Sequence, residues 1–172
     1  MLTKADVATP NVIEGWLHDM SLATAQRSDP ASNWMIELTV PGSNPLVVNV
    51  VNPKALPRAI MFVCGLVASP AHDAAFKMLD EGSRKKFWQQ LRASMNREFV
   101  EFQADGVWTE CPKSVRVTAV RFDDGLTLDS FARTLNSVCK ACADAIAHFT
   151  DNLGDPVAPA GGEFAFRKTE TQ

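Results

Sequence analysis

Two cysteines near the C-terminal end of the chain have a spacing that redox and metal sites use. Cys139 and Cys142 are separated by two residues, and such a pair can form a redox-active disulfide or supply two thiolates to zinc. Redox pairs of this kind open a helix, where the helix dipole lowers the thiol pKa. Here the pair lies well inside a predicted helix, with Cys142 on its apolar side. We therefore interpret both cysteines as structural, with a thiol or metal-binding protein as the alternative.

The other side chains that could do chemistry are scattered along the sequence. His18, His72 and His148 fall on three different predicted helices, and no sequence-local Ser, Cys or Asp partner marks one of them as a general base. Asp123 and Asp124 precede a glycine, as a turn after a strand requires. The glycines are isolated and form no phosphate-binding loop. We expect no catalytic residue, no cofactor and no enzymatic activity.

A basic stretch in the predicted central helix, residues 84–86, is followed by two aromatic residues. Basic and aromatic side chains together can bind single-stranded nucleic acid. However, Phe87 continues the apolar side of the helix, acidic residues flank the stretch, and the net charge is -3 at pH 7. We expect no nucleic-acid partner. Trp88 lies slightly off the apolar side, which favours a contact with a partner at an edge or a dimer interface.

The composition bounds the class of protein. The chain has 172 residues, 46% hydrophobic and 22% charged, which is typical of one folded domain. The first residues lack the pattern of a secretory signal, and the longest apolar run, residues 59–68, is about half the length of a membrane span. Four cysteines in a chain of this length suit a reducing compartment. We expect a cytoplasmic protein with no membrane partner.

Hydrophobic periodicity predicts the order α-β-β-β-α-β-β-α. Helices are expected at about residues 11–22 (capped by Asn11), from Ser69 to about residue 95, and from Thr127 to Leu153. The middle one is either a single helix or two collinear helices broken at 81–83. Strands are expected at 34–40, 46–51, 59–67, 99–102, 107–111 and 115–122, the last with a bulge near Ala119. This indicates an α+β fold with a mainly antiparallel sheet of about five strands.

The domain boundary is expected near Leu153. The apolar periodicity of the last helix stops there, and proline and glycine follow. We predict one α+β domain over residues 1–153 and a linker and C-terminal tail over 154–172, in which Phe164 and Phe166 are the most apolar part.

One strand has apolar residues on both faces. Along 46–51, Val47, Asn49 and Val51 share one face, while two valines and a leucine share the other. If the helices cover only one face of the sheet, the other face can bind a partner by side-chain packing, or an edge can bind it by strand addition. We therefore name Val47, Asn49, Val51 and Trp88 as candidate partner-binding residues. The alternative is that both faces are covered within one subunit.

The stretch from Val115 to Phe131 consists of a strand, the tetrapeptide Asp-Gly-Leu-Thr and a helix with an early phenylalanine. Together with the order of elements, it resembles the type III secretion chaperone-like superfamily over about residues 10–152. The tetrapeptide resembles the uncharacterised prokaryotic relatives more than the dedicated effector chaperones. The resemblance implies a small acidic homodimer without catalytic residues. We thus expect a non-enzymatic protein-binding domain, such as a chaperone or adaptor, that acts as a homodimer and binds a polypeptide partner.

Overall fold

The computed structural model describes residues 9–42, 44–95 and 100–154. Along the chain these form α1 (Pro10–Asp19), β1 (Ala23–Arg27), β2 (Ser32–Val40), β3 (Leu46–Pro53), β4 (Ala59–Val67), α2 (Pro70–Met78), α3 (Glu81–Met95), β5 (Glu101–Ala104), β6 (Ser114–Phe122) and α4 (Leu128–Leu153). The predicted α+β class is confirmed. The sheet has six strands, and all of its pairs are antiparallel.

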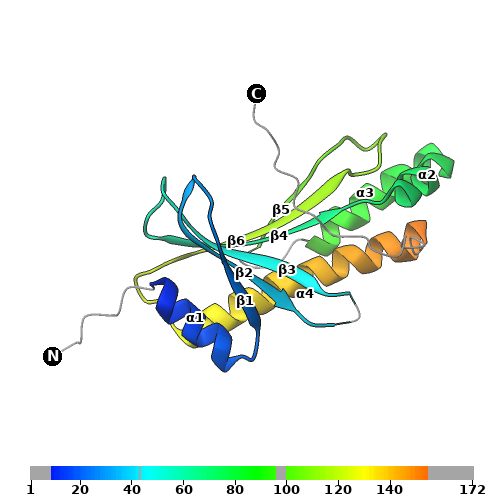
Figure 1. Ribbon diagram of the computed structural model, residues 1–172. Helices are drawn as coiled ribbons and strands as arrows, with labels where there is room; N and C mark the ends of the chain where they lie inside the picture. The colour runs from blue at the N-terminus through cyan, green and yellow to red at the C-terminus, as the bar shows by residue number, and fades with distance from the viewer. Residues whose placement is uncertain (1–8, 43, 96–99, 155–172) are drawn as a thin grey trace.

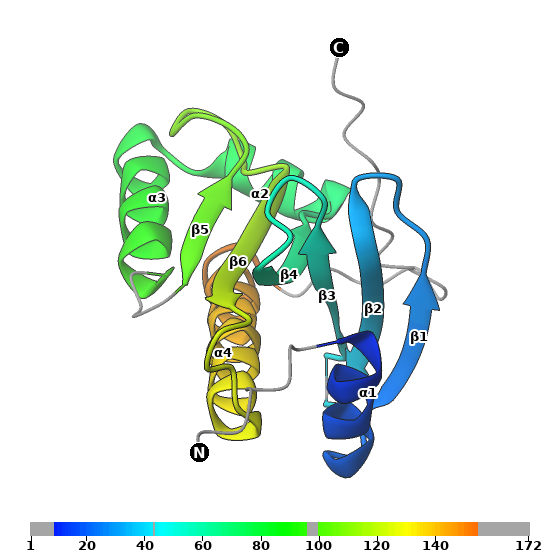
Figure 2. The same ribbon diagram turned by 90° about the vertical axis from the view of Figure 1, so that its left-hand side faces the viewer.

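The strands lie in the order β1-β2-β3-β4-β6-β5 (Figure 2). The first four follow one another along the chain, so each strand pairs with its neighbour in sequence. After α2 and α3 the chain adds β5 at the far edge and then returns as β6 between β5 and β4. Strand β4, in which the residues on both faces are apolar, therefore lies in the interior of the sheet and is paired on both sides.

The helices lie along one side of the sheet (Figure 1). The helix α4 packs across β3, β4 and β6, while α1 packs on β1 and β2. Phe131 of α4 joins these layers, because its ring lies 4.9 Å from Phe62 of β4 and 5.5 Å from Trp16 of α1, measured between ring centroids. The core is thus a single layer of side chains between the sheet and the helices.

The last helix forms as its sequence predicts. Thr127 caps it, with its hydroxyl accepting from the Ser130 amide, and the Ser130 hydroxyl accepts from the Thr127 amide in return. The apolar side of this helix forms a buried seam of Phe131, Leu135, Val138, Cys142, Ala145 and Phe149, whereas Leu128, one turn earlier, is 42% exposed. The helix ends at Leu153 and is followed by Gly154 at φ 83°, a conformation that glycine adopts without strain.

Several predicted details at the N-terminal end are wrong. Helix α1 begins at Pro10 with Thr9 as its cap, so Asn11 lies inside the helix rather than before it. It ends at Asp19, because the chain turns there into the edge strand β1. That strand was not predicted, since its sequence is short, polar and without alternation.

The predicted central helix is two helices. Leu79 adopts an extended backbone, φ -71° and ψ 144°, which ends α2. The Asp80 carboxylate then accepts from the Ser83 amide at 2.8 Å and caps α3. The break therefore falls at residues 79–80 and not at the predicted 81–83. A good N-cap residue decides its position rather than the glycine that follows.

The region around β5 and β6 differs from the predicted one. The predicted bulge near Ala119 is wrong, because β6 pairs with β4 in continuous register from Ser114 to Phe122. Residues 107–111 form a loop instead of a strand, whereas the neighbouring strand is found at 101–104. Phe99, which was predicted to begin that strand, and residues 155–172 lie outside the described residues.

Candidate functional site

The face of the sheet turned away from the helices carries apolar side chains, and we call it the outer face. Strand register places Met35, Val51, Met61 and Val120 in one row across four strands, because each is the partner of the next. Side chains alternate along a strand, so residues two positions apart share a face. The larger apolar side chains of the outer face are Met35, Val47, Val51, Met61, Val63, Val67, Val120 and Phe122.

The outer face is separate from the core. None of these eight side chains belongs to the buried core cluster or to the partly buried residues packed against that cluster. Phe122 is 59% exposed. Among the described residues, the helices contact the sheet from the opposite side. The covering of both faces within one subunit, which the sequence left open, is therefore not found in the described part of the chain.

Polar residues occupy one position in the middle of the outer face and several at its sides. Asn49 lies between Glu37 and Val63 in one row and is 7% exposed, and its side chain forms no hydrogen bond with another described residue. On one side, Arg27 and Glu37 form an ion pair at 2.7 Å. On the other side, Glu101 of β5 and Arg116 of β6 are exposed. The face thus has an apolar centre and charged sides.

The structure brings three of the four predicted partner-binding residues together. Val47, Asn49 and Val51 project from β3 onto the outer face, as predicted. The assignment of Trp88 to a partner contact is corrected, because its side chain is 3% exposed and its indole N–H donates to the Glu110 carbonyl at 3.0 Å. The loop before β6 covers Trp88, and no feature of the helix periodicity reveals that loop.

The sequence interpretation missed Met61, Val63, Val120 and Phe122. Their signal was present, because β4 is apolar on both faces and Val120 and Phe122 fall out of phase with the earlier valines. The change of phase was interpreted as a bulge. In the structure it marks a strand whose second half carries apolar residues on its outer face instead.

The cysteine pair meets a third thiol from the sheet. Cys142 is fully buried on α4 and lies close to Cys64 of β4. This contact and burial raise the pKa of Cys142 far above its usual value, and burial raises the pKa of Cys139 to about 11. All three are free thiols. Within residues 9–42, 44–95 and 100–154, no group of three or more His, Cys, Asp or Glu side chains could hold a metal ion.

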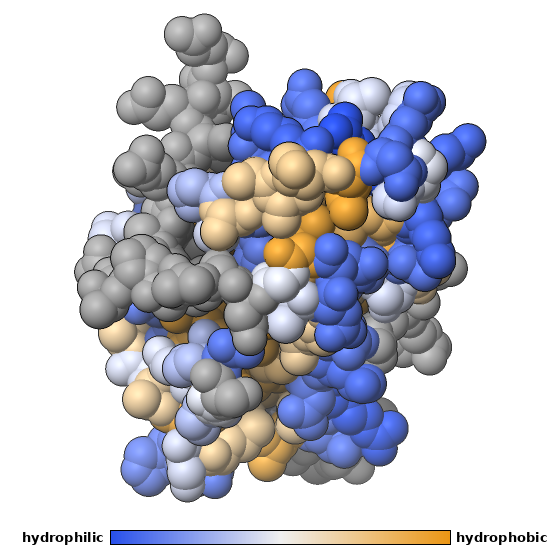
Figure 3. All heavy atoms as spheres, turned by 90° about the vertical axis from the view of Figure 1, so that its right-hand side faces the viewer, coloured by the Kyte–Doolittle hydropathy of each residue, from blue (hydrophilic) through white to orange (hydrophobic). Residues whose placement is uncertain are grey.

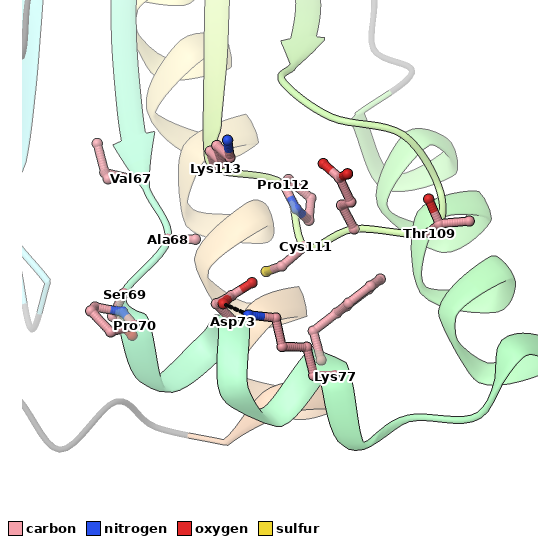
Figure 4. Close-up of a pocket in the computed structure, with 12 residues that line it drawn as sticks. Val67, Ala68, Ser69, Pro70, Asp73, Lys77, Thr109, Cys111, Pro112 and Lys113 are labelled. Atoms are coloured by element: carbon pink, nitrogen blue, oxygen red, sulfur yellow. Dashed lines mark hydrogen bonds and ion pairs between the residues drawn. The ribbon is translucent and has the colours of Figure 1, made fainter.

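A hollow of about 640 Å³ lies where β4, the start of α2 and the loop before β6 meet (Figure 4). In it the Cys111 sulfur points toward Asp73 and Lys77, which form an ion pair at 2.6 Å. Burial, and then the Asp73 carboxylate, raise the pKa of Cys111 to about 11. The hollow therefore contains a neutral thiol beside an ion pair that is satisfied within one helix.

The remaining candidates for chemistry have structural partners. Asp123 and Asp124 both pair with Arg58, at 3.1 and 3.0 Å, so the turn is held by an ion-pair network. The imidazole of His148 lies 3.0 Å from the Phe87 carbonyl oxygen. Burial lowers the pKa of His148, which favours the neutral ring. His18 is on the surface, and the His72 ring accepts from the Ser69 amide at the start of α2.

A second apolar patch lies at the end of the molecule that α2 and α3 form, bordered by hydrophilic residues (Figure 3). Met78, the last residue of α2, is 87% exposed. In the loop before β6, Val107 and Trp108 are 56% and 44% exposed. Among the described helices, none combines the length and apolar character that a membrane crossing requires.

The comparisons with known proteins place the chain in a family without assigning it an activity. No curated protein matches the sequence. The crystal structure of an uncharacterised protein from Methanothermobacter thermautotrophicus is similar to this chain, with a TM-score of 0.76 and 24% identity over 84% of this chain and 98% of the other. This likeness shows the fold alone.

Neither match carries the name of the type III secretion chaperones, so that finer resemblance stays an expectation. The model of the uncharacterised conserved family DUF2299 matches residues 9–149, which include all four described helices and all six strands in whole or in part. The chain therefore belongs to the DUF2299 family.

Proposed function

We propose that this chain is a protein-binding domain that works without catalysis and binds a polypeptide on the outer face of its sheet. The observation that carries the proposal is the row from Met35 to Val120, an apolar surface across four strands that no described helix covers. Contiguous exposed apolar surface in a folded protein usually marks an interaction site, because its hydration is unfavourable.

The distribution of charge supports the same function. Interfaces commonly have an apolar centre with few charges and a polar rim that stays in contact with water. The outer face has this arrangement, with Val51, Met61 and Val63 in the middle and charged residues on β1, β2, β5 and β6. A flat sheet surface of this kind suits a helix or a second sheet laid across it.

The chemistry of the other candidate sites favours binding over catalysis. Catalytic cysteines need a lowered pKa, whereas burial raises that of Cys111 and Cys139. The adjacent aspartates are held by Arg58. A role as an adaptor or chaperone is compatible with these observations, because such proteins need a binding surface and no nucleophile.

A site-specific crosslink tests the proposed function. A photoreactive amino acid is placed at Met61 on the outer face and, as the matched control, at Gln89 on the exposed side of α3. We expect a crosslink to a polypeptide in extracts of the native host from position 61 and none of the same mass from position 89. Loss of that crosslink when Val63→Asp is also present would support binding of the polypeptide on the outer face. The same product from both positions, or none from position 61, would contradict it.

A further inference from the structure

We infer that the polypeptide on the outer face is a second copy of this chain, packed sheet against sheet. The inference rests on the proposed function, since it names the occupant of the same surface. Three properties of the outer face favour a copy of itself over an unrelated partner. They are its area, the arrangement of charges on its two sides, and the position of Asn49.

The area of the face matches what a stable dimer buries. Strands lie about 4.8 Å apart and rise about 3.4 Å per residue, so six strands of up to nine residues present a surface of about 600–800 Å². A stable interface buries about 800 Å² on each partner. Packed sheets bury their apolar faces at a separation of about 10 Å, with strands tilted by about 30°. Two copies of the outer face therefore supply a complete interface.

The charges are arranged so that the face can pair with itself. In a two-fold dimer whose axis runs along the strands, the β1–β2 side of one copy lies over the β5–β6 side of the other. Each side carries one exposed or partly exposed cation and one carboxylate, a single row apart. Because this rotation leaves the position along the strands unchanged, Arg27 then lies one row, about 7 Å along the strands, from Glu101 of the partner subunit. Glu37 likewise lies one row from Arg116 of the partner subunit, and the long arginine side chains can span this offset. A face with one sign of charge would repel its own copy.

The side chain of Asn49 gives a third reason. It lies on β3, one of the two central strands, and has no hydrogen-bond partner among the described residues. A carboxamide both donates and accepts, so it can pair with the same group of a copy. A buried asparagine pair near a two-fold axis is a known way to fix the register of a symmetric interface. The Asn49 amide would be satisfied in the dimer by the partner's Asn49.

The mass of the full chain in solution is the first measurement. We expect sedimentation equilibrium to give twice 18.8 kDa at micromolar concentration. The decisive variant is Asn49→Asp, which keeps the shape of the side chain and places two like charges near the axis. We expect its dimer dissociation constant to rise at least about tenfold. The matched control Gln89→Glu adds the same charge on the exposed side of α3 and should change the constant less than about twofold.

The outcomes separate this inference from the proposed function. A chain that stays monomeric to about 100 µM would overturn the second copy, while a specific crosslink from Met61 to another polypeptide would keep the proposed function. A dimer that both Asn49→Asp and Val63→Asp leave intact, with unchanged circular dichroism, would place the dimer contact elsewhere. The full chain is also compared with a shortened chain that ends at Gly154. If the full chain is monomeric and the shortened chain is dimeric, residues 155–172 occupy the outer face, and the inference is overturned.

Discussion

The thiol of Cys142 on α4 lies close to the thiol of Cys64 on β4, at the buried junction of helix and sheet. Both side chains are 1% exposed or less. Cys142 in this setting behaves as a small apolar side chain with a weak donor, and its ionisation is suppressed because the neighbouring thiol and burial raise its pKa. The spacing of Cys139 and Cys142 thus places Cys142 in the packing of helix against sheet.

Replacement of Cys142 by alanine should lower the free energy of unfolding by about 1–2 kcal/mol, because a small buried group is lost and a cavity is left. Urea unfolding measures the change. Cys139→Ala is the matched comparison and should lower the free energy of unfolding by less, since Cys139 is only partly buried. Stoichiometric zinc in the purified protein, or reaction of Cys142 with a thiol reagent as fast as that of an exposed cysteine, would contradict the structural role.

The protein should lose stability as the pH falls below about 6.5, and His148 should contribute to this loss. Its folded pKa is lowered, chiefly by burial, so the unfolded chain binds the proton first and stability falls as the pH decreases through the unfolded pKa and toward the folded one. The Phe87 carbonyl and Asp151 oppose the shift only in part. Unfolding free energies measured between pH 5 and 8 test the slope.

The control for this pH dependence is the exposed His18. His148→Gln should flatten the slope between about pH 5 and 7, because glutamine cannot take up the proton, whereas His18→Gln should leave it unchanged. If His148→Gln keeps the slope of the unaltered protein, the pH dependence arises from other groups and the assignment to His148 fails.

The alternation of residues predicted the sheet faces correctly where one face is apolar and the other polar. In β2, Ile36 and Leu38 are buried and Glu37 projects outward. Capping residues likewise predicted the starts of α2 and α4, because Ser69 and Thr127 act locally on the amides that follow them. These features depend on neighbours in sequence and need no knowledge of the tertiary fold.

The features that the sequence did not predict depend on contacts between segments that are distant along the chain. Cys64 meets Cys142 only because α4 crosses β4, and Trp88 is buried only because the loop at Glu110 folds over it. The edge strand β1 is held by its pairing with β2 and carries little strand propensity of its own. Of the outer face, the sequence predicted only the residues of β3, because the contribution of the other strands depends on how the strands pair.

The indole of Trp88 should be important for stability. Trp88→Phe leaves the Glu110 carbonyl without its donor and should lower the free energy of unfolding by about 1–3 kcal/mol. The control is Trp108, which lies in the loop that covers Trp88 and is 44% exposed. Trp108→Phe should change stability by less than about 0.5 kcal/mol. Equal effects of the two changes, followed by chemical denaturation, would contradict the structural role given to Trp88.

A chain that ends at Gly154 should melt within a few degrees of the full chain. The buried seam of α4 ends at Phe149, and the Gly154 amide, at the end of the helix, donates a hydrogen bond to the Thr150 carbonyl. The expectation follows from the end of apolar periodicity at that point. Differential scanning calorimetry of both chains tests it. A fall of ten degrees or more would mean that residues 155–172 add stability to the domain.

Phe62 and Met61 are adjacent on β4 and project to opposite faces of the sheet, so their alanine variants separate the core from the outer face. Phe62 is fully buried against Phe131, and Phe62→Ala should lower the free energy of unfolding by about 3–5 kcal/mol at any protein concentration. Met61→Ala should cost much less in dilute protein, because this side chain has no contact with the core cluster.

The concentration dependence of Met61→Ala is the informative part. If a second copy covers the outer face, the deficit of Met61→Ala should grow as protein concentration rises from below to above the dimer dissociation constant, since association stabilises the folded state by mass action. Urea unfolding at two concentrations a hundredfold apart measures this. A loss for Met61→Ala as large as that for Phe62→Ala, and equal at both concentrations, would mean that the outer face is packed within a single chain.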